Sequence, residues 1–285
     1  MKTGMEKLLV LKQRIITALI ISVVCITLLF GLSPFLFSLS VIPVMILAGW
    51  EWTNLAAIVS RLGKSAFLFA LCGLVGLAAW WLRLGAEIDF DRGKQLSLAA
   101  VTLWAIIFLW IQGYPSSAIL WGKKLVLAVI GLLVLTFTWI ALVLIVHRPE
   151  GQWLFILAIA IVALADTGGY FAGKAFGKNK LAPVVSPGKT WEGFWGGILM
   201  QLVLIGLLLL LLPAGTSPVS LFLLVVPVAL SSVIGDLFES MVKRHSGVKD
   251  SSHLLPGHGG ILDRIDGFMA ALPLYSLLLI LLNVI

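Results

Sequence analysis

The sequence predicts an all-α, polytopic integral membrane protein with about nine transmembrane helices. Sixty per cent of its 285 residues are hydrophobic, only 12% are charged, and the mean hydropathy is +1.10. Soluble domains are roughly half apolar and a quarter charged, so a soluble fold has too little interior to hide this much apolar surface. In lipid, a run of about 20 apolar residues spans the hydrocarbon as a helix, because each backbone polar group must be satisfied within the segment.

Nine apolar runs account for the predicted helices. In chain order they lie at roughly 15–32, 35–51, 66–84, 96–112, 125–146, 153–173, 194–212, 219–235 and 265–285. The second run is the weakest of the nine, because it contains Pro43 and follows a very short turn at 31–34. If this run does not span the membrane, every later helix crosses it in the opposite direction.

The positive charges predict how these helices are oriented. The net charge of +7 does not indicate nucleic-acid binding, because the basic residues lie between apolar runs instead of on one solvated face. Lys and Arg favour cytoplasmic loops, and with the N-terminus in the cytoplasm sixteen of the 20 basic residues fall on that side. Only Arg83, Arg92, Lys94 and Arg148 fall on the other. Nine spans with a cytoplasmic N-terminus are therefore consistent with the charge pattern.

Asp166 is the first candidate site residue. It lies about 13 residues, or about 20 Å, into the sixth apolar run. An ionisable side chain is costly at that depth in lipid and is therefore a functional candidate. Alternatively, Asp166 pairs with a neighbouring lysine or caps a helix break, while Gly168, Gly169 and Gly173 let helices pack closely.

The segment 186–193, Ser-Pro-Gly-Lys-Thr-Trp-Glu-Gly, is the second candidate. It is not a Walker A loop, because Pro183 stands where the leading glycine is required and no buried parallel strand precedes it. A lysine-rich turn that opens a helix can still present positive charge and free N–H groups to phosphates, with Ser186 and Lys189 as the contacts. The alternative is a basic loop that attracts anionic lipid headgroups.

The densest group of polar residues lies at 236–266. Asp236, Ser240 and Lys243 share one helical stripe by their i, i+4, i+7 spacing. Asp263 and Asp266 share a face in the first turn of the last helix, after a glycine-rich segment whose backbone can approach a ligand closely. Paired carboxylates amid basic residues suit Mg²⁺ with a polyphosphate.

Zinc is a poor fit to the same region. The histidines of this segment have no cysteine nearby, and their spacings of eight and five residues match no usual zinc pattern. They are His245, His253 and His258.

The segment 240–266 resembles the signature of the phosphatidate cytidylyltransferase family, also called CDP-diacylglycerol synthases. The matching positions are Ser240, Lys243, Arg244, Lys249, Asp250, Ser252, Leu255, Pro256, His258, Gly259, Gly260, Asp263, Arg264, Ile265 and Asp266. The segments 166–170 and 186–193 also resemble family motifs, so the likeness covers roughly 150–285. In the N-terminal half only the hydropathy is shared, and no residue there can be assigned a role.

This resemblance implies a Mg²⁺-dependent nucleotidyltransferase of phospholipid biosynthesis that joins CTP to phosphatidic acid, giving CDP-diacylglycerol and pyrophosphate. It implies a homodimer in the cell inner membrane and leaves room for a second cation such as K⁺. We expect residues 1–150 to form an N-terminal group of about five helices and 151–285 to form the catalytic region, with the active site facing the cytoplasm.

We assign roles on this basis. The expected catalytic residues are Asp263, Asp236, Lys243, Arg264 and His258. The expected substrate-binding residues are Lys189, Ser186, Arg244, Lys249, Gly259 and Gly260. The expected Mg²⁺ ligands are Asp263 as the principal one, with Asp236, Asp266 and Asp166.

Three other functions are alternatives to this prediction. A CTP-dependent polyprenol or phytol kinase has a similar membrane architecture but gives a product that carries a phosphate instead of a CMP group. A CDP-alcohol phosphotransferase is disfavoured because its Asp-Gly-x-x-Ala-Arg pattern is absent. A transporter would spread its polar residues through the midplane and show an internal repeat, whereas here they gather near one face.

Overall fold

The computed structural model describes residues 4–213, 215–252, 254–255 and 259–282, which are almost entirely helical. In chain order the elements are α1 (Gly4–Gly31), α2 (Pro34–Ser40), α3 (Ile42–Leu55), α4 (Arg61–Trp81), α5 (Phe90–Gln112), α6 (Ala118–Trp121), α7 (Lys124–Val146), α8 (Gly151–Phe176), β1 (Lys180–Ala182), β2 (Ser186–Thr190), α9 (Trp191–Leu211), α10 (Pro218–His245) and α11 (Leu262–Leu282).

The helices confirm the predicted polytopic membrane fold. Eight segments of the described chain are long and apolar enough to cross a membrane, and Ile16–Gly31 within α1 is a shorter apolar helix. The weak second run forms one span, Pro34–Leu55, made of α2 and α3. Pro43 lies in the first turn of α3, where the missing proline N–H would have no helical partner in any case.

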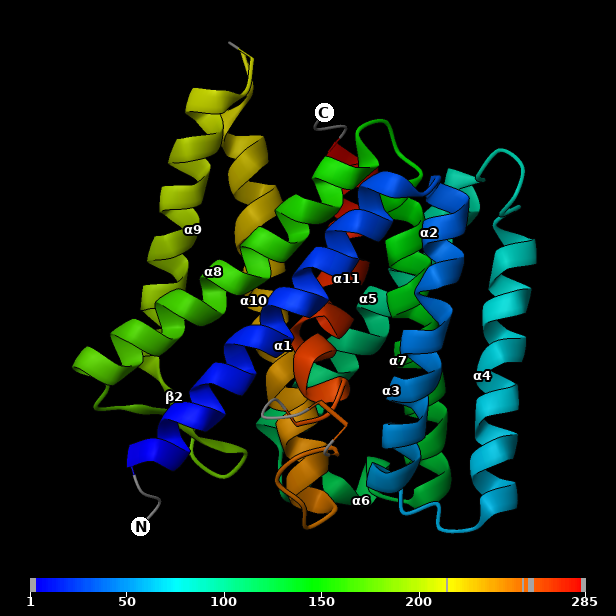
Figure 1. Cartoon of the computed structure of the whole chain (residues 1–285), viewed down its shortest axis with the longest axis vertical. Coiled ribbons are helices and arrows are strands. Elements are labelled where there is room, and N and C mark those ends of the chain that lie inside the picture. Colours follow the sequence, from blue (N-terminus) through cyan, green and yellow to red (C-terminus); the bar gives the residue numbers. More distant parts are fainter. Residues whose placement is uncertain (1–3, 214, 253, 256–258, 283–285) are drawn as a thin grey trace.

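The connections divide between two ends of the molecule (Figure 1). One end carries the start of α1, the α3–α4 turn, α6, the β1–β2 hairpin and the segment that follows α10. The other end carries the α4–α5, α7–α8 and α9–α10 connections. Among the residues that the structure describes, the two groups of basic residues separated by the charge pattern thus belong to segments at opposite ends. Which end faces the cytoplasm stays a prediction.

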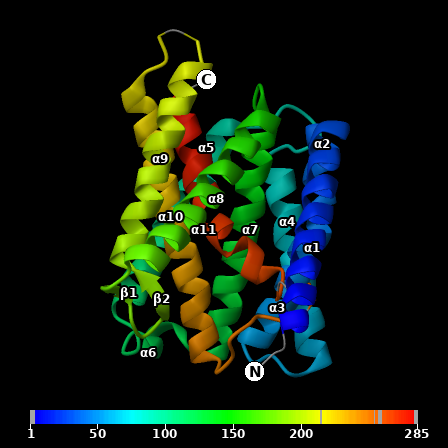
Figure 2. The same cartoon turned by 60° about the vertical axis from the view of Figure 1, so that its left-hand side comes forward.

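Helix α7 is the centre of the fold (Figure 2), and it packs against α3, α4, α5, α8 and α11. The indole of Trp52 on α3 donates to the Leu127 carbonyl of α7 at 2.8 Å, and that of Trp139 on α7 donates to the Ser38 carbonyl of α2 at 2.9 Å. Residues from before and after position 150 share both hydrophobic clusters of the core. The two halves of the chain are therefore packed together, and their assignment to separate roles stays a prediction.

A short antiparallel hairpin joins α8 to α9, with Lys180 paired to Thr190 and Ala182 to Ser186. This corrects the expectation of a turn that opens a helix, because Ser186–Thr190 is a strand and α9 begins at Trp191, capped by the Thr190 side chain. The Glu192 carboxylate accepts hydrogen bonds from the backbone N–H groups of Lys178 and Asn179 at 3.1 and 3.2 Å. The hairpin is thereby fastened to the first turn of α9.

Candidate active site

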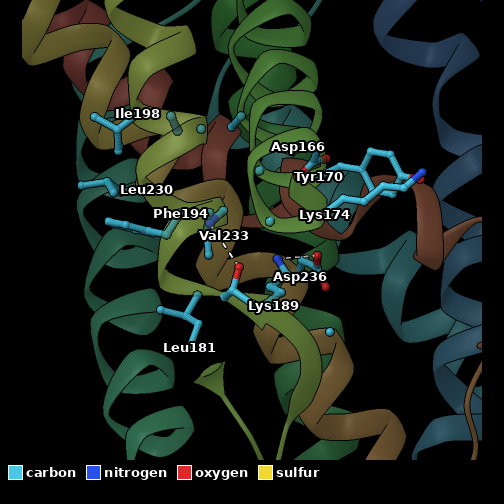
Figure 3. A pocket seen from close by; sticks show the side chains of 18 residues that line it. Asp166, Tyr170, Lys174, Leu181, Lys189, Phe194, Ile198, Leu230, Val233 and Asp236 are labelled. Carbon is cyan, nitrogen blue, oxygen red and sulfur yellow. Dashed lines mark hydrogen bonds and ion pairs between the residues drawn. The ribbon is translucent and has the colours of Figure 1, made fainter. Parts of the chain in front are cut away.

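A cavity of about 460 Å³ lies where α8, the hairpin, α9 and α10 meet (Figure 3). Its polar lining includes Asp166 and Lys174 from α8, Lys189 from β2 and Asp236 from α10. Gly169 and Gly173 also line it, whereas Gly168 is buried against the backbone of Gly196 on α9. The three sequence motifs, far apart along the chain, therefore converge on one place.

Lys189 and Asp236 form an ion pair inside this cavity. Lys189 Nζ lies 2.6 Å from Asp236 Oδ2, and the Ser240 hydroxyl donates to Asp236 Oδ1 at 3.2 Å. The two paired side chains are 24% and 31% exposed, so a ligand can still reach them. The pair brings together two predicted site residues, one binding and one catalytic. It also confirms that Asp236 and Ser240 share a stripe of α10.

Lys243, one turn further along α10, lies between two carboxylates. Its Nζ is 2.6 Å from Glu239 Oε2 and 2.6 Å from Asp263 Oδ1. Glu239 is fully buried and was not singled out from the sequence, although its i−4 spacing from Lys243 is the signal that could have identified it. The predicted catalytic residues Lys243 and Asp263 are thus in direct contact.

The Asp263 carboxylate is held in place from its other side as well. Its Oδ2 accepts from Ser251 N at 3.1 Å, Ser251 Oγ at 2.9 Å and Gly260 N at 2.8 Å. Gly259 has a φ of +83°, and a Cβ there would lie 2.7 Å from the same oxygen. The glycine-rich backbone therefore approaches Asp263 itself. Lys243 contacts Oδ1 and three donors contact Oδ2, so protein groups already engage both oxygens, and the role of Asp263 as principal metal ligand stays a prediction.

Glu51 of α3 also joins this hydrogen-bond network, although it lies outside the motifs identified from the sequence. It is fully buried, and its two oxygens accept hydrogen bonds from both sides of the glycine-rich segment. The expectation that no residue of the N-terminal half could be assigned is therefore incomplete. The available signal was an isolated acid between Trp50 and Trp52 in an apolar run.

The remaining predicted residues surround these contacts. Asp266 Oδ1 accepts from Gly267 N at 2.8 Å, on the part of α11 that packs closely on Gly235 of α10.

Ser186 lies half-buried in β2. Arg244, Lys249 and Arg264 are exposed. His258 lies outside the described residues, as does His253, and the predicted roles of all these residues stay predictions.

His245 has a packing role in the structure. Its Nε2 lies 3.2 Å from the Gly122 carbonyl oxygen, and its ring centroid is 4.9 Å from that of Trp121. These contacts fix the end of α10 to α6 and account for the histidine without a metal.

Acidic groups outnumber basic groups in this network. Its electrostatically interacting members are the acids Asp166, Asp236, Glu239, Asp263 and Asp266 and the bases Lys189, Lys243 and Arg264. Within the described parts of the chain, no three acidic, histidine or cysteine side chains converge as a ready-made metal cage. Mg²⁺ is commonly held by one or two carboxylates together with substrate phosphates, and Asp166 and Asp236 on the cavity wall fit that arrangement.

A second cavity of about 510 Å³ adjoins the first between α5, the hairpin, α9 and α10. The two share the side chains of Leu181, Phe194, Leu230 and Val233, and most of the second lining is aliphatic or aromatic. A cavity that carries charged side chains, next to one lined mostly by apolar side chains, suits an amphipathic ligand with a charged head and a hydrocarbon tail.

Fold and site together define a multi-pass membrane protein with a charged cavity next to an apolar one. The chain belongs to the cytidylyltransferase family, whose model matches residues 12–282. It is 39% identical over 284 residues to the phosphatidate cytidylyltransferase of Haemophilus influenzae, covering 93% of this chain and 97% of that one. It is 40% identical over 281 residues to that of Pseudomonas aeruginosa, covering 94% and 97%.

These matches confirm the family predicted from the signature. They also extend it, because they cover the N-terminal half, where the expected likeness was in hydropathy alone. The family membership and the convergence of the motifs make the cavity the candidate active site.

Proposed function

We propose that this membrane protein transfers the CMP group of CTP to phosphatidate, forming CDP-diacylglycerol and releasing pyrophosphate. The observation that carries the proposal is the cavity with the charged side chains Asp166, Lys189 and Asp236, which shares a wall with an apolar cavity. Family membership supports the nucleotide, and the paired cavities support a lipid acceptor.

The reaction joins two phosphate-bearing molecules. A phosphatidate oxygen attacks the α-phosphorus of CTP, and the bond to the pyrophosphate oxygen breaks. Such a transfer depends on positioning and on neutralising negative charge more than on covalent help from the protein. Lys189 and Lys174 line the cavity and supply positive charge for the phosphates. When a phosphate takes over Lys189, the Asp236 carboxylate becomes available to a cation.

Mg²⁺ dependence belongs to this proposal. Asp166 and Asp236 would hold the ion, with Asp266 close enough to add to the local negative charge. When bound, Mg²⁺ neutralises charge on the phosphate oxygens. Asp236 and Lys189 orient the bound groups, and Lys243 keeps Asp263 and Glu239 fixed beside them.

The orientation of the protein in the membrane and its oligomeric state are also part of the proposal. Of the 19 basic residues that the structure describes, fifteen belong to segments at the end of the molecule that carries the hairpin, which we assign to the cytoplasm, where CTP is present. The lipid phosphate would lie in the first cavity and part of an acyl chain in the second. An inner-membrane homodimer remains our expectation from the family resemblance.

Purified protein in detergent tests the function directly. Phosphatidate and Mg²⁺ are supplied with CTP labelled at either the α- or the γ-phosphate, and lipid products are separated by thin-layer chromatography. We expect label in the lipid only from α-labelled CTP, none after chelation of the metal, and none from the Asp263→Ala variant. Label from γ-phosphate would identify a lipid kinase instead. Substrate movement across vesicles without CTP turnover would identify a transporter.

A further inference from the structure

Glu51 lies far along the chain from every group it contacts. It belongs to α3, in a part of the chain without an assigned role, and its partner Ser251 is 200 residues away. Its side chain is fully buried. A buried carboxylate is costly unless its oxygens are satisfied, so three hydrogen bonds from other groups, with Ser251 as a shared fourth donor, indicate that the surroundings are organised around it.

These hydrogen bonds join the two sides of the glycine-rich segment. Before it, Glu51 Oε1 accepts from the Ser252 hydroxyl at 2.5 Å. After it, Oε1 accepts from Ile261 N at 2.9 Å and Oε2 from Leu262 N at 2.7 Å, at the start of α11. Unpaired N–H groups at a helix start favour a carboxylate partner. One side chain thus fixes both the approach to α11 and its first turn.

Ser251 connects Glu51 to Asp263. The Ser251 Oγ lies 3.0 Å from Glu51 Oε2 and 2.9 Å from Asp263 Oδ2. A hydroxyl has one proton to donate, so it serves one of the two carboxylates at a time. Gly260 completes the connection, because its N–H bonds Asp263 and a Cβ there would lie 2.6 Å from each Glu51 oxygen.

We propose that Glu51 is a positioning residue for the transfer reaction. It sets the orientation of Asp263, and through Asp263 that of Lys243, by holding Ser251 and the start of α11. The N-terminal half of the chain therefore contributes to the active site in addition to packing against it. The inference rests on the proposed function for its kinetic test.

The Glu51→Gln variant keeps the side-chain shape but places an NH₂ group against hydrogen-bond donors. We expect kcat to fall at least about tenfold, with the KM for CTP within about twofold, since Glu51 does not line the cavity of Asp166, Lys189 and Asp236. Ser251→Ala should act through the same connection. The kcat of the double variant should therefore lie within about twofold of the kcat of the less active single variant. Glu87→Gln, in the exposed loop at the opposite end, is the matched control and should behave as wild type.

Full kcat in Glu51→Gln, or losses that multiply in the double variant, would overturn the proposal. If Glu51→Gln does not yield folded protein, Ser252→Ala is used in its place, because it removes one donor to Glu51. It is then compared with Ser251→Ala and with the double variant, and the same results support or overturn the proposal. Hydrogen exchange of the peptide that contains Ile261 and Leu262 provides a readout that needs no turnover. Faster exchange in Glu51→Gln supports the anchor, and unchanged exchange refutes it. Wild-type protein that makes no CDP-lipid would contradict the proposed function while leaving this exchange test decisive.

Discussion

Lys243 shows how much depends on one side chain in this network. It is 13% exposed, Glu239 is fully buried and Asp263 is 9% exposed. Glu239 Oε1 is also buried without a partner among the described residues. Removal of the lysine would leave two neighbouring carboxylates with no compensating charge. The resulting loss of folding stability is larger than the stability that the intact ion pair contributes.

We therefore expect Lys243→Met to lose about 3–5 kcal/mol of stability. It should also lose at least about a hundredfold in turnover, because Asp263 loses its charged partner on Oδ1. Unfolding in detergent and the labelled-CTP assay measure the two effects. Lys123→Met, exposed at the same end of the molecule, is the control and should change neither. A Lys243→Met protein as stable as wild type would show that the carboxylates are satisfied in another way.

Lys189 has a different predicted signature, because it faces the cavity and its partner Asp236 is also partly exposed. We expect Lys189→Met to raise the KM for CTP by about tenfold or more, since a charge-assisted contact to phosphate contributes about 1.5–3 kcal/mol. Thermal stability should change little. Lys180→Met, exposed on the other strand of the hairpin, should leave the KM unchanged. An equal rise in both variants would indicate a general effect of positive charge at the membrane face.

At the scale of elements, the crossing of α8 and α9 shapes the cavity wall. Gly197 of α9 is buried against α8, and a Cβ there would lie 2.9 Å from the Ala165 carbonyl oxygen. Close backbone approach at small residues is a usual basis for helix association in membranes. The residue that follows Ala165 is Asp166, so the spacing of these two helices also sets where that carboxylate lies.

Gly197→Ala should destabilise the protein by about 1–3 kcal/mol, because the added methyl forces the helices apart. Turnover should fall with it, since α8 carries Asp166. Gly206→Ala, on an exposed face of the same helix with no atom within 4 Å of the new Cβ, is the control. It should be neutral or slightly stabilising, because alanine is the better helix former. Thermal unfolding of both variants in one detergent makes the comparison, and equal midpoints would contradict the packing argument.

The elements also show what a sequence can and cannot reveal here. Hydropathy predicted the membrane-spanning runs, since lipid imposes length and composition on each helix by itself. The spacing of Asp236 and Ser240 predicted their contact for the same local reason. The hairpin and Glu51 were missed. A three-residue strand has too few residues to show a pattern, and the partners of Glu51 are set by packing between helices 200 residues apart.

At the scale of the whole molecule, the separation of basic residues between the two ends predicts its orientation. In a variant with Cys25→Ser and Cys72→Ser, single cysteines are introduced as Lys178→Cys beside the hairpin and Ala86→Cys in the α4–α5 connection. A membrane-impermeant maleimide added to spheroplasts, whose inner membrane is still sealed, should label the Ala86→Cys variant alone. Lys178→Cys should react only after permeabilisation. The reverse pattern would place the proposed active site on the outer side.

The apolar cavity has a kinetic consequence. Its rim includes Phe108, Val184 and Trp191, which are exposed on the surface of the bundle, so a lipid tail would enter it from the plane of the membrane. The lipid concentration that such an enzyme meets is then a surface density, the mole fraction of phosphatidate among its neighbours, instead of an amount per volume. Adding inert detergent or lipid at constant total phosphatidate should slow the reaction, whereas diluting the whole mixture at constant surface composition should slow it only through CTP.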